Sequence, residues 1–92
     1  MIDGTARPKL APKVRLRFDR HSGQHWLMYP ERGMSLNVSA ARIAALCTGE
    51  QTVDAIIDLL HAEAAGCERV QVAADVRHFL EALLERSLVR LA

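Results

Sequence analysis

The first part of the chain alternates between apolar and polar residues, as a half-buried β-strand does. Val14, Leu16 and Phe18 are apolar, and charged residues stand between them, so one face of the strand can be buried. Bulky residues over 24–29 and a second alternation over 34–38 predict two more strands. Turn-forming residues separate the three segments. The pattern therefore predicts an antiparallel meander whose outer edge is open and able to receive a peptide.

From Ser39 onward the apolar residues recur every three or four positions, which predicts three helices. The predicted caps and ends of these helices are, in chain order, Ser39, Gly49, Thr52, Gly66 and about Ser87. A short extended stretch can follow at residues 89–91. Three N-terminal antiparallel strands followed by three helices indicate an α+β fold of the winged-helix type.

Length and composition favour one small domain over residues 1–92. Half of the residues are apolar and a quarter are charged, which is typical of packed proteins and not of disordered ones. Pro8 and Pro12 restrict the backbone, so we expect an extended arm over residues 1–12. Because no apolar run approaches the roughly 20 residues of a membrane span and no secretion signal is present, we expect a cytoplasmic protein without a membrane partner.

Charge is divided unevenly along the chain. Residues 1–32 contain seven basic and three acidic residues, whereas residues 33–92 contain five and eight. A chain with this polarity is able to steer a charged partner to one end or to pair with itself. We therefore expect that it can form a homodimer.

The residue types that enzymes use are present but are not arranged for catalysis. No serine lies in a GxSxG setting, and the five glycines are too scattered to cradle a phosphate. Cys47 and Cys67 have no CxxC partner, and the four histidines do not fall at ligand spacing on one helix. We expect no enzymatic activity, no cofactor and no metal.

A winged-helix DNA-binding module is the main alternative from the residues alone, and a structural dimerisation module is the third. The short link between the first two predicted helices fits a helix-turn-helix. However, the second helix carries Asp54, Asp58 and Glu63 and no lysine or arginine, which does not suit an element that binds phosphates. Only the arginine-rich first strand, with Arg15 and Arg17, fits such a partner, and we expect no nucleic-acid binding.

Several short motifs follow one another over nearly the whole chain. They are Pro8-Lys9-Leu10-Ala11-Pro12, Val14-Arg15-Leu16-Arg17-Phe18-Asp19, Trp26-Leu27, Pro30-Glu31-Arg32-Gly33, Leu36-Asn37, Ile43-Ala44-Ala45-Leu46-Cys47, Gly49, Thr52-Val53, Asp75-Val76 and Phe79-Leu80. In this combination they resemble the pyrroloquinoline quinone (PQQ) biosynthesis protein D family, PqqD. The chain departs from the family pattern at Lys13, where glycine is common, and at Thr48, where aspartate is usual.

The resemblance implies a peptide chaperone, or precursor-recognition domain, rather than an enzyme. Family members bind the ribosomal precursor peptide PqqA and present it to the radical S-adenosylmethionine (SAM) enzyme PqqE. In the family the peptide lies as an added strand on the third strand, against the third helix. The peptide-binding residues that this implies here are Ser35, Leu36, Asn37, Asp75, Val76, Phe79 and Leu83. A structural interpretation stays open beside this one, with Asp75 at a helix start and Val76 and Phe79 in the core.

Overall fold

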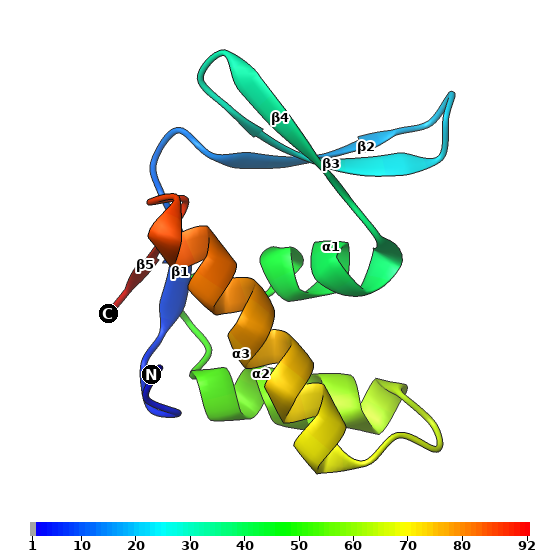
Figure 1. Cartoon of the computed structure of the whole chain (residues 1–92), viewed down its shortest axis with the longest axis vertical. Coiled ribbons are helices and arrows are strands. Elements are labelled where there is room, and N and C mark those ends of the chain that lie inside the picture. Colours follow the sequence, from blue (N-terminus) through cyan, green and yellow to red (C-terminus); the bar gives the residue numbers. More distant parts are fainter. Residues whose placement is uncertain (1) are drawn as a thin grey trace.

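Three antiparallel strands lie above a short helix, and two longer helices pack below it (Figure 1). The computed structural model describes residues 2–92. Its elements are β1 (Pro8–Leu10), β2 (Arg15–Asp19), β3 (Gln24–Tyr29), β4 (Arg32–Leu36), α1 (Val38–Ala45), α2 (Val53–Glu63), α3 (Arg69–Glu85) and β5 (Val89–Leu91). This order confirms the predicted α+β fold of a three-stranded meander followed by three helices, compatible with the winged-helix type. Two short strands, β1 and β5, flank that core.

The meander has the strand order β2-β3-β4, and its register places a row of apolar residues on one face. Leu16 of β2 pairs with Leu27 of β3, and Leu27 pairs with Met34 of β4. Leu27 is fully buried, whereas the charged residues of β2 alternate with this row and point to the other face. The sheet therefore covers α1 with one face and exposes the other to solvent.

Asn37, and not Ser39, caps α1. The Asn37 Oδ1 atom accepts a hydrogen bond from the backbone N–H of Ala40 at 2.7 Å. The prediction of Ser39 as the cap was wrong because the apolar Val38 continues the alternation of the preceding strand. In the structure β4 ends at Leu36, and Val38 is the first residue of α1 with an exposed side chain.

Thr52 caps α2 as predicted, since its hydroxyl accepts a hydrogen bond from the backbone N–H of Ala55 at 3.0 Å. The predicted helix ends at glycine were too late by several residues. α1 ends at Ala45 and α2 at Glu63. The glycines, at positions 49 and 66, have positive φ angles of 86° and 82° and belong to the turns that follow, because a left-handed conformation costs glycine little.

β1 is hydrogen-bonded on both sides. It pairs antiparallel with β5 on one side. On the other side the Leu10 N–H donates to the carbonyl of Cys47 at 3.1 Å, and the Gly49 N–H donates to the carbonyl of Pro8 at 2.9 Å. A strand that contains a proline is thus held between the C-terminus and the loop that joins α1 to α2.

Residues 2–6 supply hydrogen-bond acceptors to the first turn of α2. The backbone N–H groups of the first two residues of α2 donate to the carbonyls of Ala6 and Gly4, each at 2.9 Å. Such groups have no partner within their own helix. In addition, Arg77 of α3 donates to the carbonyl of Ile2 at 2.7 Å, and the Ile2 side chain is buried. Residues 2–11 therefore pack against both long helices.

The core lies between the sheet, α1 and the facing sides of α2 and α3. Its most completely buried aliphatic side chains are Leu27, Val53, Ile56, Ile57, Val76, Leu80 and Leu83. No buried side chain among residues 2–92 is polar or charged. Over the same residues, each helix is too short or too polar to span a bilayer.

The cap of α1 can be tested with a pair of substitutions. Replacing Asn37 by alanine removes the side-chain acceptor for the Ala40 N–H and should lower the free energy of unfolding by about 1 kcal/mol. Ser39→Ala should change it by less than about 0.5 kcal/mol, since an exposed position without a cap role tolerates substitution. Urea unfolding followed by circular dichroism measures both. Equal losses for the two variants would contradict the assignment of the cap.

Candidate functional site

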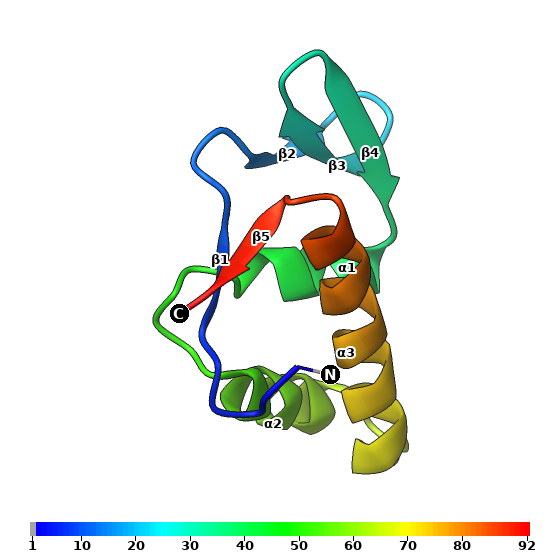
Figure 2. The same cartoon turned by 60° about the vertical axis from the view of Figure 1, so that its left-hand side comes forward.

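β4 forms an open edge of the sheet on the side of α3. It pairs only with β3 among the described strands, and Figure 2 shows it on the same side of α1 as α3. Tyr29 and Arg32 close the tight turn between β3 and β4. The closing pair of such a hairpin exchanges both backbone hydrogen bonds, and bonded and unbonded pairs alternate from there. The main-chain groups of Gly33 and Ser35 therefore point away from β3 and are free to pair with another strand.

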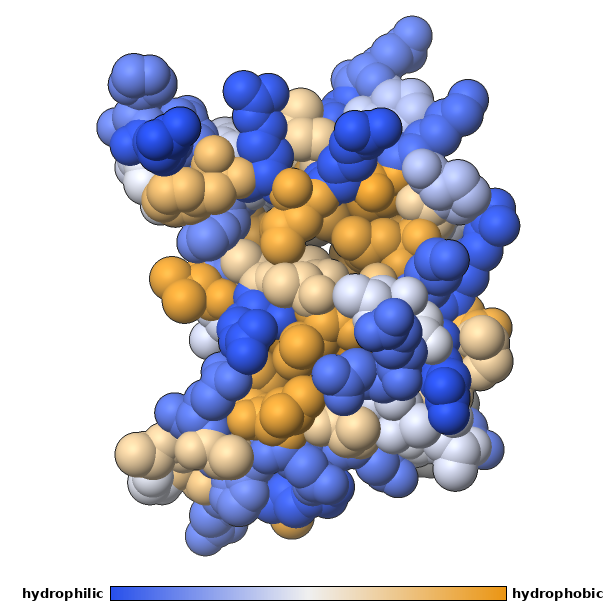
Figure 3. Space-filling view, turned by 180° about the vertical axis from the view of Figure 1, so that it is seen from behind, coloured by the Kyte–Doolittle hydropathy of each residue, from blue (hydrophilic) through white to orange (hydrophobic). Residues whose placement is uncertain are grey.

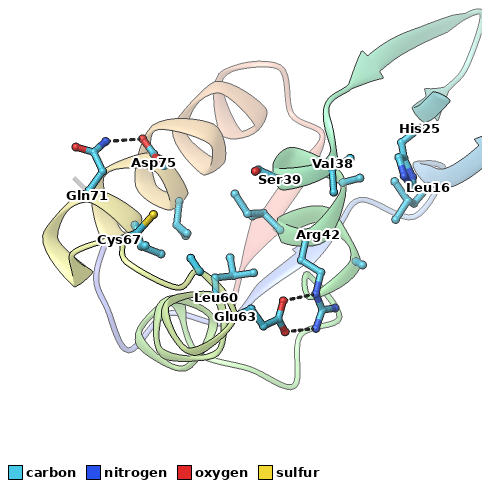
Figure 4. Close-up of a pocket in the computed structure, with 16 residues that line it drawn as sticks. Leu16, His25, Val38, Ser39, Arg42, Leu60, Glu63, Cys67, Gln71 and Asp75 are labelled. Carbon is cyan, nitrogen blue, oxygen red and sulfur yellow. Dashed lines mark hydrogen bonds and ion pairs between the residues drawn. The ribbon is translucent and has the colours of Figure 1, made fainter. Parts of the chain in front are cut away.

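A groove of about 550 Å³ passes along α1 between the sheet and the two long helices. Its α3 end is formed by Gln71, Val72, Asp75 and Val76, and its β2 end by Leu16, His25 and Val38. Between these ends it is lined by residues that include Ser39, Arg42, Leu60, Glu63 and Cys67 (Figure 4). From behind, apolar side chains gather around a hollow between the sheet and α2 (Figure 3). The groove thus offers mainly apolar contacts.

One ion pair joins α1 to α2 across the groove. The guanidinium of Arg42 donates to both carboxylate oxygens of Glu63, with Nε–Oε1 and Nη2–Oε2 distances of 3.0 and 2.7 Å. The hydrogen bond from Arg42 and its positive charge lower the pKa of Glu63, and Glu63 raises the pKa of Arg42. Both side chains are about half exposed. A pair of this kind contributes little to stability, and it bridges α1 and α2 in the lining of the groove.

Asp75 is the carboxylate at the α3 end. Its Oδ1 accepts a hydrogen bond from the amide nitrogen of Gln71, one turn earlier, at 3.1 Å. It takes part in none of the three salt bridges found among residues 2–92. Asp75 is therefore available to pair with a cationic group or a backbone N–H of a ligand.

The structure divides the seven predicted peptide-binding residues into two groups. The side chains of Leu36, Val76 and Leu83 are buried in the core, although Val76 also contributes to the groove. The other four lie at or near the surface. Asn37 caps α1, and Asp75 lines the groove. Phe79 is half-buried on α3, and the Ser35 hydroxyl donates a hydrogen bond to Gln24 Oε1 at 3.2 Å. Ser35 can thus contact a peptide through its backbone, and Asp75 and Phe79 can do so through their side chains.

Arg42 and Glu63 were not predicted as site residues. They are 21 positions apart in the sequence, and their contact depends on how α1 packs against α2. The available sequence signal was weak: Arg42 is the one charged residue of α1, and Glu63 ends α2.

The two cysteines have opposite environments. Cys47 is buried, its thiol donates to the carbonyl of Ile43 at 3.3 Å, and burial raises its pKa from 9.0 to about 12. Cys67 is exposed at the groove. Within residues 2–92 no three His, Cys, Asp or Glu side chains are close enough to hold a metal ion. The groove thus combines a mainly apolar lining with one exposed thiol.

Residues 24–89, which include β3, β4 and all three helices, match the family model described as coenzyme PQQ synthesis protein D (PqqD). The chain belongs to the PqqD family. Relatives named PqqA binding protein include one from Methylococcus capsulatus, 32% identical over 84 residues, which cover 89% of this chain and 85% of the relative. Another, from Pseudomonas fluorescens, is 32% identical over 91 residues, 99% of this chain and 98% of the relative.

Solved structures show the same PqqD fold. The solution structure of the PqqD part of Methylobacterium extorquens PqqCD, described as a stand-alone recognition element for ribosomally synthesised, modified peptides, aligns with a TM-score of 0.81 and 28% identity. The alignment covers 98% of this chain and 95% of that one. TbiB1, solved with the TbiA(β) leader peptide, aligns with a TM-score of 0.75 at 24% identity over 89% of this chain and 94% of TbiB1, which shows a shared fold.

The environments of the cysteines predict selective thiol modification. At pH 8 the thiol of Cys47 stays protonated because its pKa is about 12, and only thiolates react readily. Ellman's reagent should therefore modify one thiol per native chain and two after unfolding in guanidinium. Cys67→Ser should abolish the native reaction and Cys47→Ala should leave it intact. Two rapid reactions in the native chain would contradict the buried position of Cys47.

Proposed function

We propose that this chain is a peptide chaperone of PQQ biosynthesis, which binds the precursor peptide PqqA and presents it in the cytoplasm to the radical SAM enzyme PqqE. The supporting observation is an open strand edge at β4, in a chain that also has an apolar groove ending at Asp75 of α3 and whose family relatives are named PqqA binding proteins. An edge of this kind favours an extended peptide, because main-chain hydrogen bonds supply affinity and neighbouring pockets supply specificity.

In this proposal the peptide adds a strand to β4. The main-chain groups of Gly33 and Ser35, which face away from β3, pair with the peptide backbone. The side chains of Asp75 and Phe79 lie one turn apart on α3 and contact the peptide from the side. Leu36, Val76 and Leu83 contribute by holding β4 and α3 in place, since their side chains are buried.

Binding without catalysis is the role that the groove supports. Its charged groups are largely committed to one another, as the Arg42–Glu63 pair shows. The DNA-binding alternative is less well supported, because the basic residues near α2 are engaged: Arg69 pairs with Asp58 and Arg77 with Asp54. A helix with this acidic surface does not favour contact with phosphates.

Titration with PqqA tests the proposal directly. Isothermal calorimetry should show one peptide per chain, and a peptide of the same composition in scrambled order should not bind. Amide shifts on titration should be largest in β4 and α3. Absence of PqqA binding, together with salt-sensitive binding of random duplex DNA, would favour the DNA-binding alternative instead.

The backbone of Ser35 gives the sharpest prediction. Ser35→Pro removes an N–H that points to the open edge and should weaken PqqA binding by about 0.5–1.5 kcal/mol, or roughly two- to tenfold. Ser35→Ala keeps the N–H and loses only the hydroxyl bond to Gln24, so it should bind like the unmodified chain. Calorimetry compares the two variants. Equal affinities would exclude β4 as the paired edge.

Asp75 gives an independent prediction. Asp75→Asn removes the carboxylate charge at the α3 end while keeping its size, and should weaken PqqA binding by about two- to fivefold, as expected for a half-exposed charged contact. The loss should shrink as salt is raised, because counterions screen exposed charges. Glu50→Gln, an exposed charge change in the α1–α2 loop, is the control. Equal effects of both changes would indicate a general charge effect.

A further inference from the structure

β2 is a second open edge, on the opposite side of β3 from β4. Trp26 of β3 faces Ser35 in β4 and Arg17 in β2. Because the Trp26–Ser35 pair is not hydrogen-bonded, the main-chain groups of Trp26 pair with those of Arg17. By the same alternation, Leu16 and Phe18 direct their N–H and carbonyl groups away from the sheet. The β2 edge therefore has main-chain groups that can pair with an added strand.

Apolar side chains lie directly beneath this edge. Phe18 is 52% exposed, and its ring centroid lies 4.8 Å from that of His25. His25, Leu16 and the exposed Val38 form the β2 end of the groove. The view from behind shows this apolar surface below the sheet with hydrophilic side chains above it (Figure 3). Phe18 is thus an exposed aromatic side chain at a strand edge, on the same sheet face as the groove residues Leu16 and His25.

The charge of the edge defines the partner. Lys13, Arg15, Arg17 and Arg20 are all exposed, and none of them takes part in an ion pair within the described part of the chain. The single acidic residue among them, Asp19, is hydrogen-bonded to its own turn, at 2.9 Å to the His21 N–H and 3.0 Å to the Ser22 hydroxyl. The edge is thus positively charged, and its complement is an acidic segment.

A second copy of this chain fits the same edge less well. Antiparallel pairing of two β2 strands about Leu16 places Arg15 opposite Arg17, and like charges opposite each other destabilise strand pairs. Pairing about Phe18 places Arg17 opposite Asp19, whose carboxylate is already hydrogen-bonded to its own turn. A nucleic acid would satisfy the arginines but could not pair with the main-chain groups of Leu16 and Phe18. An extended protein segment with acidic side chains satisfies both.

We propose that the β2 edge, with Phe18 and the flanking arginines, docks an acidic extended segment of the enzyme that modifies the bound peptide. This inference rests on the proposed function, which places the peptide at β4 and α3. The two strands lie on opposite sides of β3, so both edges can be occupied at once. The groove runs from Asp75 at its α3 end to Leu16 at its β2 end, so an enzyme docked at β2 lies at the opposite end of the groove from Asp75, which the proposed function places against the peptide.

Matched substitutions on two different strands test the docking surface. Arg17→Glu and Phe18→Ser alter β2. Arg90→Glu and Leu91→Ser are the controls, because Arg90 and Leu91 are also exposed strand residues, but on β5. Binding of each variant to purified PqqE is measured by biolayer interferometry and binding to PqqA by calorimetry, after thermal melting has shown that each variant folds. Random duplex DNA is tested on the same sensors.

The expected result is at least a tenfold loss of PqqE affinity for the two β2 variants, with unchanged PqqA affinity and normal PqqE binding by the β5 controls. The loss for Arg17→Glu should diminish at high salt. PqqE binding that is equal in all variants would overturn the inference and leave the proposed function intact. PqqE binding that is absent in the unmodified chain would overturn the inference together with the presentation step of the proposed function, while PqqA binding would still support the peptide-binding step. Duplex DNA binding that depends on Arg17 in place of PqqE binding would also overturn it. Loss of PqqA binding by the unmodified chain would instead contradict the proposed function.

Discussion

The hydrogen bonds made by residues 2–11 set the arrangement of the helices on which the groove depends. These residues supply acceptors to the first N–H groups of α2, to Arg77 of α3 and to the loop after α1, and they pair with β5. Each of these partners has a main-chain or charged group that would be costly to bury unpaired. One short segment thus fixes α1, α2 and α3 relative to one another, and the groove lies between these three helices.

The parts of the fold with a local signal could be predicted from the sequence. Alternation gave β2 and β4, bulky residues gave β3, and the helical period gave α1, α2 and α3 with the cap at Thr52. Prediction was incomplete for elements whose structure depends on residues far away in the sequence. β1 has three residues, one of them a proline, and its pairing depends on β5, about 80 positions away. The cap of α1 was misplaced because Val38 fits both the strand pattern that ends and the helix that begins.

For the candidate site, sequence patterns identified an edge strand and a helix but not which side chains are accessible. On α3 the apolar residues at positions 76, 79 and 83 share one helical face, yet Val76 and Leu83 are buried and Phe79 is only half-buried. The difference arises because α2 packs against α3, and this packing cannot be seen in a local sequence pattern. The Arg42–Glu63 pair depends on the same tertiary packing.

The pairing of β1 with β5 also holds the C-terminal residue against the residue that precedes β1. The Arg7 N–H donates to the Ala92 carbonyl at 3.1 Å, and the Ala92 N–H donates back to Arg7 at 3.0 Å. Both ends lie below the meander that carries the free strand edges (Figure 1). A domain joined to the C-terminus would therefore leave β2 and β4 accessible.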